Sequence, residues 1–181
     1  MYRRTGGGVT LSGGEPTAQP AFCAALLDAL RGAGYHTCLV TCGYCETESF
    51  QKIAAKADMV LYDLKHIDTI EHERLTGASN KLIIKNLHKL EMAGIPTEIR
   101  VPVISGLNDD DNNIEGISSL LSPIDCVKSI VLLGYHALGQ SKIYDFCKRG
   151  ADIGVAAPKQ IELERLAARM GAASGKSVTF R

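Results

Sequence analysis

The chain has 181 residues, and its 20 basic and 20 acidic side chains leave it without formal net charge. This balance gives no electrostatic reason to expect nucleic acid or an anionic membrane as a partner. No apolar run approaches the roughly 18 residues needed to span a bilayer. The six cysteines are scattered through a chain of ordinary core composition, unlike a secreted disulfide framework. We therefore expect a single cytoplasmic domain, residues 1–181, partnered by neither nucleic acid nor membrane.

Apolar runs typical of buried strands alternate with stretches of helical periodicity. The predicted strands cover residues 9–12, 37–41, 59–64, 97–103, 129–135 and 178–180. Helices are predicted over about 20–33, 50–57, 80–93, 109–121 and 158–171, whereas 66–79 and 137–157 are assigned no element. In the first helix, Phe22, Leu26 and Leu30 are expected on the inward face. Such strand–helix units imply right-handed crossovers and a parallel sheet, either open and doubly wound or curled into part of a barrel.

A glycine pair, an acid and a proline follow the first predicted strand, at residues 13–16. Two adjacent glycines at the carboxyl end of a strand let the main chain turn sharply and come within hydrogen-bonding distance of a ligand. Ligands usually bind at this end of the strands in α/β sheets and barrels. The simpler interpretation is a plain strand-to-helix turn, which Gly-Gly marks more often.

The longer string at residues 6–16, G-G-G-V-T-L-S-G-G-E-P, closely resembles one family. This family comprises the activating enzymes of glycyl radical enzymes, such as pyruvate formate-lyase activating enzyme, within the radical S-adenosylmethionine (SAM) superfamily. The resemblance runs from about Gly6 to the C-terminus. It implies an α/β fold, an incomplete parallel (β/α) barrel of about five βα units. It also implies that Gly13, Gly14 and Glu15 hold the methionine part of SAM through their main chain.

Asp63 and Lys65 lie two residues apart at the end of a predicted strand, so their side chains leave the same face. Alone, such a pair is more simply an edge salt bridge or two solvated residues. The resembling family carries a matching Asp-Leu-Lys that contacts SAM, which implies a binding role for Asp63, Leu64 and Lys65.

Three further residues gain a role from the resemblance. Arg100 follows Glu98 on one face of a strand, so it is either part of the SAM pocket or a buried partner of Glu98. His136, in the context L-x-Y-H-x-L-G-x-x-K, matches a family histidine that touches the ribose and methionine region of SAM. Thr41 begins a Thr-Cys-Gly-Tyr turn whose threonine lies near SAM in the family.

Two other patterns suggest metal binding, but each has a simpler explanation. Cys42 and Cys45 form a Cys-x-x-Cys pair, but zinc needs four ligands and no second pair has suitable spacing nearby. The acid run at residues 109–111 is better explained by the favourable interaction of acids with a helix N-terminus. Val40 occupies a position that is normally acidic in the resembling family, which removes the carboxylate that could hold a monovalent cation. We expect no metal ligand and no general acid or base in this chain.

The cysteines that define the superfamily are missing from the sequence. Radical SAM enzymes bind a [4Fe–4S] cluster through a Cys-x3-Cys-x2-Cys loop, and no three of the cysteines present have that spacing. We therefore expect this chain to be the C-terminal two-thirds of an activating enzyme, with the first strand and the cluster loop absent. The cluster would belong to the full-length protein only.

The resemblance implies a radical reaction for the full-length enzyme. A reduced cluster, fed by a donor such as flavodoxin or ferredoxin, would cleave SAM, and the resulting radical would take a hydrogen atom from a glycine of a partner glycyl radical enzyme. The alternatives are a non-catalytic fragment that binds SAM or docks a partner, and a barrel lyase or aldolase that uses Lys65 as a Schiff base.

Overall fold

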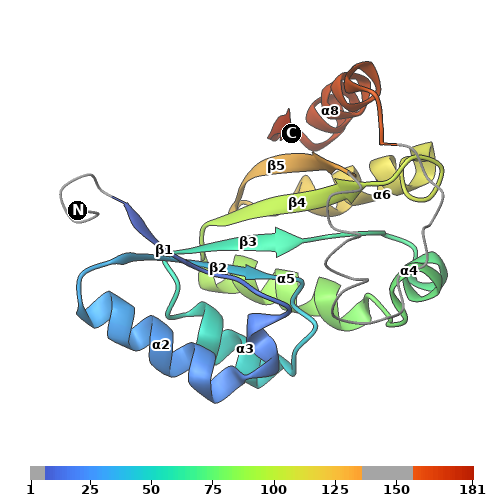
Figure 1. Cartoon of the computed structure of the whole chain (residues 1–181). Coiled ribbons are helices and arrows are strands. Elements are labelled where there is room, and N and C mark those ends of the chain that lie inside the picture. Colours follow the sequence, from blue (N-terminus) through green and yellow to red (C-terminus); the bar gives the residue numbers. More distant parts are fainter. Residues whose placement is uncertain (1–6, 136–156) are drawn as a thin grey trace.

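The computed structural model describes residues 7–135 and 157–181 of the chain. Within them, six parallel strands form one sheet in the order β1-β2-β3-β4-β5-β6 (Figure 1). These strands are β1 (Gly8–Leu11), β2 (His36–Thr41), β3 (Met59–Asp63), β4 (Thr97–Val103), β5 (Val127–Gly134) and β6 (Ser177–Phe180). Since β1 and β6 lie at opposite edges, the sheet is open. The strands therefore do not close into a full barrel, and the predicted incomplete parallel barrel is confirmed.

Helices connect the strands and pack on one face of the sheet. They are η1 (Pro16–Ala18), α2 (Pro20–Gly32), α3 (Thr47–Ala54), α4 (Thr69–Thr76), α5 (Lys81–Ala93), α6 (Asp111–Leu121) and α8 (Gln160–Ser174). Strand β4 shows the resulting alternation, because Ile99, Val101 and Val103 are buried in the core that the helices share, whereas Glu98 and Arg100 are only half-buried. Figure 1 shows α2, α3 and α5 together on the covered side.

The other face of the sheet has no helix among the described residues and carries polar side chains. We call it the open face, and it includes Asp63, Glu98 and Arg100. Strand register places Asp63 directly beside Arg100. Two apolar side chains, Leu61 and Val131, are buried on this face outside the main core. Parallel sheets are normally covered on both faces, so a face that carries charged groups and that no helix of the described residues covers is suited to hold a ligand.

Two details differ from the sequence-based predictions. Helix α4 forms inside the polar stretch 66–79, where the sequence pattern predicts no element; Asp68 caps its N-terminus by accepting from two backbone amides, and Gly77 ends it in the left-handed conformation. In α2 the predicted inward face is only partly correct: Leu26 and Leu30 pack against the core, but Phe22 is 64% exposed, and the fully buried side chains are Cys23 and Leu27. The residue at which α2 ends, and the bounds of β1 and β2, the strands before and after it in the chain, are close to the predicted ones.

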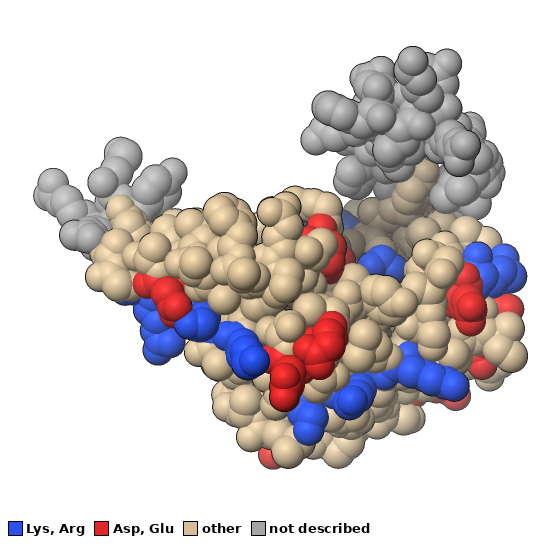
Figure 2. All heavy atoms as spheres, turned by 90° about the horizontal axis from the view of Figure 1, so that it is seen from below, with Lys and Arg blue, Asp and Glu red and all other residues tan. Residues whose placement is uncertain are grey.

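The side seen from below, where α2 and α3 lie, carries charges of both signs. Lys and Arg side chains alternate there with Asp and Glu, and no single sign dominates (Figure 2). None of the helices in the described ranges combines the length and the apolar composition of a membrane span.

Candidate functional site

The turn after β1 is open on its outer side. Gly13 has φ of +147°, a conformation that side chains disfavour. A Cβ atom added at Gly13 or at Gly14 would meet no heavy atom within 4 Å. Both glycines are exposed, so the main chain of this turn can be reached from outside the protein.

Glu15 follows this turn and directs its carboxylate into the protein. Its Oε1 atom accepts from the Thr17 amide at 3.1 Å, from the Thr17 hydroxyl at 2.7 Å and from the Thr41 hydroxyl at 2.7 Å. Its Oε2 atom accepts from the Cys42 amide at 2.9 Å and from the Cys42 thiol at 3.0 Å. The carboxylate thus caps η1 and joins the turn after β1 to the end of β2.

These bonds keep Glu15 ionised in a partly buried place. Burial by itself would raise the pKa of this carboxyl, but the hydrogen bonds from Cys42, Thr41 and Thr17 outweigh it and the pKa lies below its usual value. With both oxygens satisfied inside the protein, the side chain fixes the turn, and the main chain of Gly13 and Gly14 is what the turn presents outward.

Thr41 and Cys42 also have their polar groups in hydrogen bonds inside the protein. The Thr41 side chain is buried, and its hydroxyl accepts from the Gly43 amide at 2.9 Å while donating to Glu15. Burial and the bond to Glu15 raise the pKa of Cys42 to about 11, and burial raises the pKa of Cys45. Both thiols are therefore protonated at neutral pH, and protonated thiols are poor nucleophiles and poor metal ligands. The Thr41 side chain is therefore linked to the turn after β1 through its contact with Glu15.

Hydrogen bonds from residues that the sequence analysis did not single out hold the turn after β2 in place. Asn86 of α5 donates to the Gly43 carbonyl and the Cys45 carbonyl, each at 2.8 Å. Gly43 has φ of +70°, and a Cβ there would come within 1.8 Å of the Tyr62 hydroxyl. That hydroxyl donates to the Ile83 carbonyl at 2.6 Å. A buried asparagine in an amphipathic helix is the only sequence signal that could have indicated this contact.

Asp63 and Lys65 extend from the carboxyl end of β3 as an ion pair. The Lys65 Nζ lies 3.9 Å from Asp63 Oδ2, and about a third of each side chain is exposed. Burial raises the pKa of Asp63, although the charges of Lys65 and Arg100 partly offset this, and the charge of Glu15 adds to the rise. A Schiff-base lysine is activated by desolvation or by a neighbouring cation, whereas Lys65 is partly exposed and lies beside a carboxylate.

Arg100 lies next to Asp63 in the sheet and is paired on its own strand. Its Nε donates to Glu98 Oε1 at 3.4 Å, and Glu98 also accepts from the Ser129 hydroxyl at 3.3 Å. Leu64 turns the other way: its side chain is fully buried in the core, and its amide donates to the Arg100 carbonyl at 2.8 Å. Leu64 can therefore offer a ligand only its main chain.

The structure thus brings most of the expected residues to one edge of the sheet. The hydrogen bonds of Glu15 join the turn after β1 to the end of β2, and β2 pairs with β3 as far as Thr41 beside Tyr62, so the ends of these three strands adjoin. Val40 is on the open face beside Leu61 in register. His136 lies outside the described residues. Such an edge combines free main-chain groups, a carboxylate and two cations, which suits a ligand that carries both an ammonium group and a carboxylate.

No metal centre is present among the described residues, since no three His, Cys, Asp or Glu side chains come close enough together to hold an ion. The acids at 109–111 have separate structural contacts. Asp109 accepts from the Gly106 amide at 2.7 Å, Asp110 caps α6 through the Asn113 amide at 3.1 Å, and Asp111 pairs with Arg169.

Comparison with known proteins assigns the chain to a family. The family model of the radical SAM superfamily matches residues 2–114. Isethionate sulfite-lyase activating enzyme of Nitratidesulfovibrio vulgaris is 44% identical over 156 residues, which cover 85% of this chain and 50% of that protein. Trans-4-hydroxy-L-proline dehydratase activating enzyme of Clostridioides difficile is 38% identical over 169 residues, covering 92% of this chain and 56% of that protein. The chain therefore spans about half the length of these curated relatives.

A solved structure shares the fold along nearly its whole length. The crystal structure of a domain of pyruvate-formate lyase-activating enzyme from Bacteroides vulgatus superposes with a TM-score of 0.80 at 26% identity, and the match covers 97% of this chain and 99% of that one. Pyruvate formate-lyase-activating enzyme of Staphylococcus epidermidis is 35% identical over 147 residues, covering 78% of this chain and 59% of that protein. The chain therefore belongs to the radical SAM superfamily, and its relatives there are activating enzymes of glycyl radical enzymes.

Proposed function

We propose that this chain is the SAM-binding part of an activase that generates a glycyl radical on a partner enzyme. Membership of the superfamily implies SAM together with a [4Fe–4S] cluster. SAM, when bound and reductively cleaved, would supply the radical that removes a hydrogen atom from a glycine of the partner. The partner would be pyruvate formate-lyase or a relative, and the electron would come from a flavodoxin or ferredoxin.

The observation that carries this proposal is the convergence of the Gly13–Gly14 turn with Asp63 and Lys65 at one edge of the sheet. SAM carries an ammonium group, a carboxylate, two ribose hydroxyls and a sulfonium. The open turn can accept the methionine moiety against its main chain, because added Cβ atoms at both glycines would project into free space. The described residues therefore fit SAM.

Each charged residue at this edge has a chemically distinct role in the proposal. Lys65 and Arg100 would attract the ligand carboxylate, and Asp63 would accept from a ribose hydroxyl or the ammonium group. Glu15 would act indirectly, by holding the turn against Thr41 and Cys42. His136 would add a hydrogen bond from an imidazole near the ribose.

The described residues do not fit an iron–sulfur cluster. They contain no group of metal-binding side chains close enough together, and no three cysteines in the sequence have the Cys-x3-Cys-x2-Cys spacing. We therefore propose that residues 1–181 bind SAM without cleaving it.

Calorimetric titration of SAM into the purified chain tests the proposal. We expect saturable binding to the unaltered chain and at least tenfold weaker binding to Lys65→Met, since a charge-assisted contact is worth roughly 1.5–3 kcal/mol. Lys52→Met is the matched control, because Lys52 is an exposed helical lysine paired with Glu48. No binding by the unaltered chain, or equal loss in both variants, would contradict the assignment.

A second measurement separates SAM binding from activation. Electron paramagnetic resonance of a mixture of the chain, a reductant, SAM and a glycyl radical enzyme is expected to show no glycyl radical. A radical signal from this mixture would overturn the proposal that the chain is inactive by itself, while leaving the SAM site unaffected.

A further inference from the structure

Strands β3 and β4 separate just where the proposed SAM-binding residues lie. Their register ends with Asp63 beside Arg100, and one more backbone bond follows, from the Leu64 amide to the Arg100 carbonyl at 2.8 Å. Lys65 comes directly after this last bond. Its peptide is therefore beyond the regular ladder that fixes the rest of β3.

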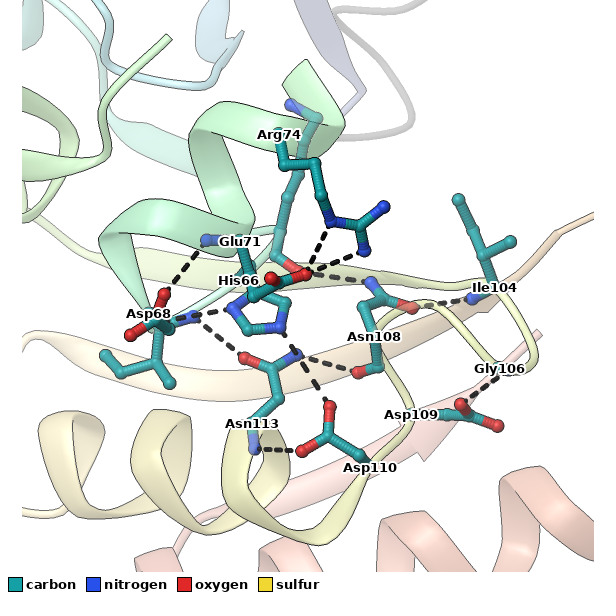
Figure 3. Close-up of polar contacts among 12 residues, drawn as sticks. His66, Asp68, Glu71, Arg74, Ile104, Gly106, Asn108, Asp109, Asp110 and Asn113 are labelled. Atoms are coloured by element: carbon teal, nitrogen blue, oxygen red, sulfur yellow. Dashed lines mark hydrogen bonds and ion pairs between the residues drawn. The ribbon is translucent and has the colours of Figure 1, made fainter. Parts of the chain in front are cut away.

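Asn108, in the loop after β4, replaces the missing ladder contacts. Its Nδ2 donates to the Lys65 carbonyl at 3.1 Å and to the Pro102 carbonyl at 2.6 Å. Its Oδ1 accepts from the Ile104 amide at 2.8 Å. The side chain, only 4% exposed, thus joins the ends of both strands, as Figure 3 shows.

Asn108 is itself held in place by α6. Its carbonyl accepts from Asn113 Nδ2 at 2.7 Å, and Asn113 Oδ1 accepts from the Ile67 amide at 2.8 Å. Asn113 is fully buried near the first turn of α6, which Asp110 caps. The two asparagines form a continuous connection from α6 to the loop that carries Lys65 (Figure 3).

A hollow of about 690 Å³ opens beside this connection. It is bordered by Lys65, Leu75, Pro102, Leu107 and Asn108. Lys65 therefore has free space on one side, and its ammonium group is 3.9 Å from Asp63 on the other. With space available, the position of its peptide decides where the ammonium group can reach.

We propose that Asn108 is a positioning residue for Lys65 in SAM binding. It would fix the Lys65 peptide through the carbonyl bond and so keep the ammonium group directed at the ligand carboxylate, without touching SAM itself. This inference rests on the proposed function, because it assigns to Asn108 a contribution to the same site.

Asn80, the N-cap of α5, provides a matched control because its side chain contacts the same loop. It is also buried, and its Nδ2 donates to two carbonyls, those of His66 at 3.1 Å and Ile67 at 2.6 Å. Those carbonyls lie one and two residues beyond Lys65, so neither bond involves the Lys65 carbonyl or β4. Asn80→Asp therefore removes the same kind of contact from the same loop while leaving the Lys65 carbonyl bond intact.

The first measurement needs no ligand. Hydrogen exchange of the Leu64 amide, followed by NMR, reports whether the ends of β3 and β4 stay together. We expect Asn108→Asp to speed exchange at Leu64 roughly tenfold, because its carboxylate cannot donate to the two carbonyls. Asn80→Asp should leave exchange at Leu64 within about twofold. If Asn108→Asp does not fold, Asn108→Ser serves instead, since its short hydroxyl cannot reach both carbonyls.

The second measurement is a double-mutant cycle on the dissociation constant for SAM. We expect Asn108→Asp to weaken binding roughly tenfold when Lys65 is present and less than about twofold in the Lys65→Met background, because coupled residues are not additive. Asn80→Asp should have little effect in either background. Unchanged binding in Asn108→Asp, equal loss in both backgrounds or an equal effect of Asn80→Asp would overturn the positioning role.

The two measurements distinguish failure of this inference from failure of the proposed function. If the unaltered chain binds no SAM, the proposed function fails and the positioning role fails with it, whatever the exchange rates are. If SAM binds and Lys65→Met weakens it, but Leu64 exchanges equally fast in both asparagine variants, only the role of Asn108 is wrong.

Discussion

The carboxylate of Glu15 and the hydroxyl of Thr41 are joined by a hydrogen bond of 2.7 Å. The two residues are 26 positions apart in the chain, and the bond fastens the turn after β1 to the end of β2. Since the Cys42 amide and thiol occupy the second oxygen of Glu15, this acid is a structural support of the site. Its influence on a ligand would pass through the main chain of Gly13 and Gly14.

Replacing Glu15 by Gln should therefore weaken both folding and SAM binding. The amide cannot accept all five bonds, and its NH2 group would face donors, so we expect the free energy of unfolding to fall by about 1–3 kcal/mol. Urea denaturation measures this change. Glu46→Gln is the control, because Glu46 also accepts from two backbone amides but is exposed at the start of α3. A change in SAM affinity as large in Glu46→Gln as in Glu15→Gln would contradict the role given to Glu15.

Glu15 should also contribute to acid sensitivity. Its pKa is lowered in the folded protein, so its stabilisation is fully present above the ordinary glutamate pKa of about 4.3 and is lost as the pH falls through the lower folded value. Stability measured from pH 6 down to pH 3 should decline less steeply in Glu15→Gln than in the unaltered chain. Identical slopes would mean that the hydrogen bonds to the Glu15 carboxylate do not stabilise the folded protein in this pH range.

Asp63 should show the opposite behaviour. Burial raises its pKa, so the folded state binds this proton more tightly than the unfolded state, and stability falls as the pH rises from about 3.9 through the folded value. Asp63→Asn removes the cost of the buried charge. At pH 7 we expect it to raise the free energy of unfolding by up to about 1 kcal/mol while weakening SAM binding, a trade between stability and function. Lower stability at pH 7, measured by urea denaturation, would contradict this.

Gly43 should be intolerant of any side chain. An alanine at this position would have to adopt the left-handed backbone conformation, and its Cβ would collide with the Tyr62 hydroxyl. We therefore expect Gly43→Ala to lower the free energy of unfolding by about 3 kcal/mol or more. Gly77→Ala isolates the first effect, because Gly77 has φ of +79° and open space around it. We expect that variant to lose about 1–2 kcal/mol. Equal losses in denaturation experiments would show that Tyr62 moves aside without cost.

Gly14 should behave differently from Gly43, since its φ is not positive and an added Cβ meets nothing within 4 Å. Gly14→Ala is expected to change the free energy of unfolding by no more than about 0.5 kcal/mol. Its methyl group would nevertheless stand where the ligand approaches the main chain, so SAM affinity should fall. Gly32→Ala, at the end of α2 with open space around it, is the control and should bind SAM normally. Unimpaired binding by Gly14→Ala would place the ligand elsewhere.

Local pattern suffices to predict most of the fold. Strand β4 is predicted at residues 97–103 and forms Thr97–Val103, because alternating Ile99, Val101 and Val103 bury one face of it. Helix α4 escapes prediction since it has little apolar periodicity: His72 is its only buried side chain among those described. Its N-cap Asp68, followed by Glu71 three positions later, is the signal that could have identified it.

Only part of the candidate site can be predicted from the sequence. Asp63 and Lys65 can be paired from strand alternation, and the structure brings them within 3.9 Å. The supports of the site cannot be found in this way, because Glu15, Asn86 and Asn108 reach partners that only the folded sheet brings near. Nothing in the spacing of a single asparagine or glutamate along the chain indicates which carbonyl or amide it will meet.

The central claim is that SAM lies against the turn after β1 and the end of β3. Backbone amide NMR spectra of the chain, recorded as SAM is added, test it most directly. We expect the largest shifts at Gly13, Gly14 and Lys65, with the amides of α8 unchanged. Shifts confined to the helix-covered side of the molecule, or no shifts at saturating SAM, would contradict the account.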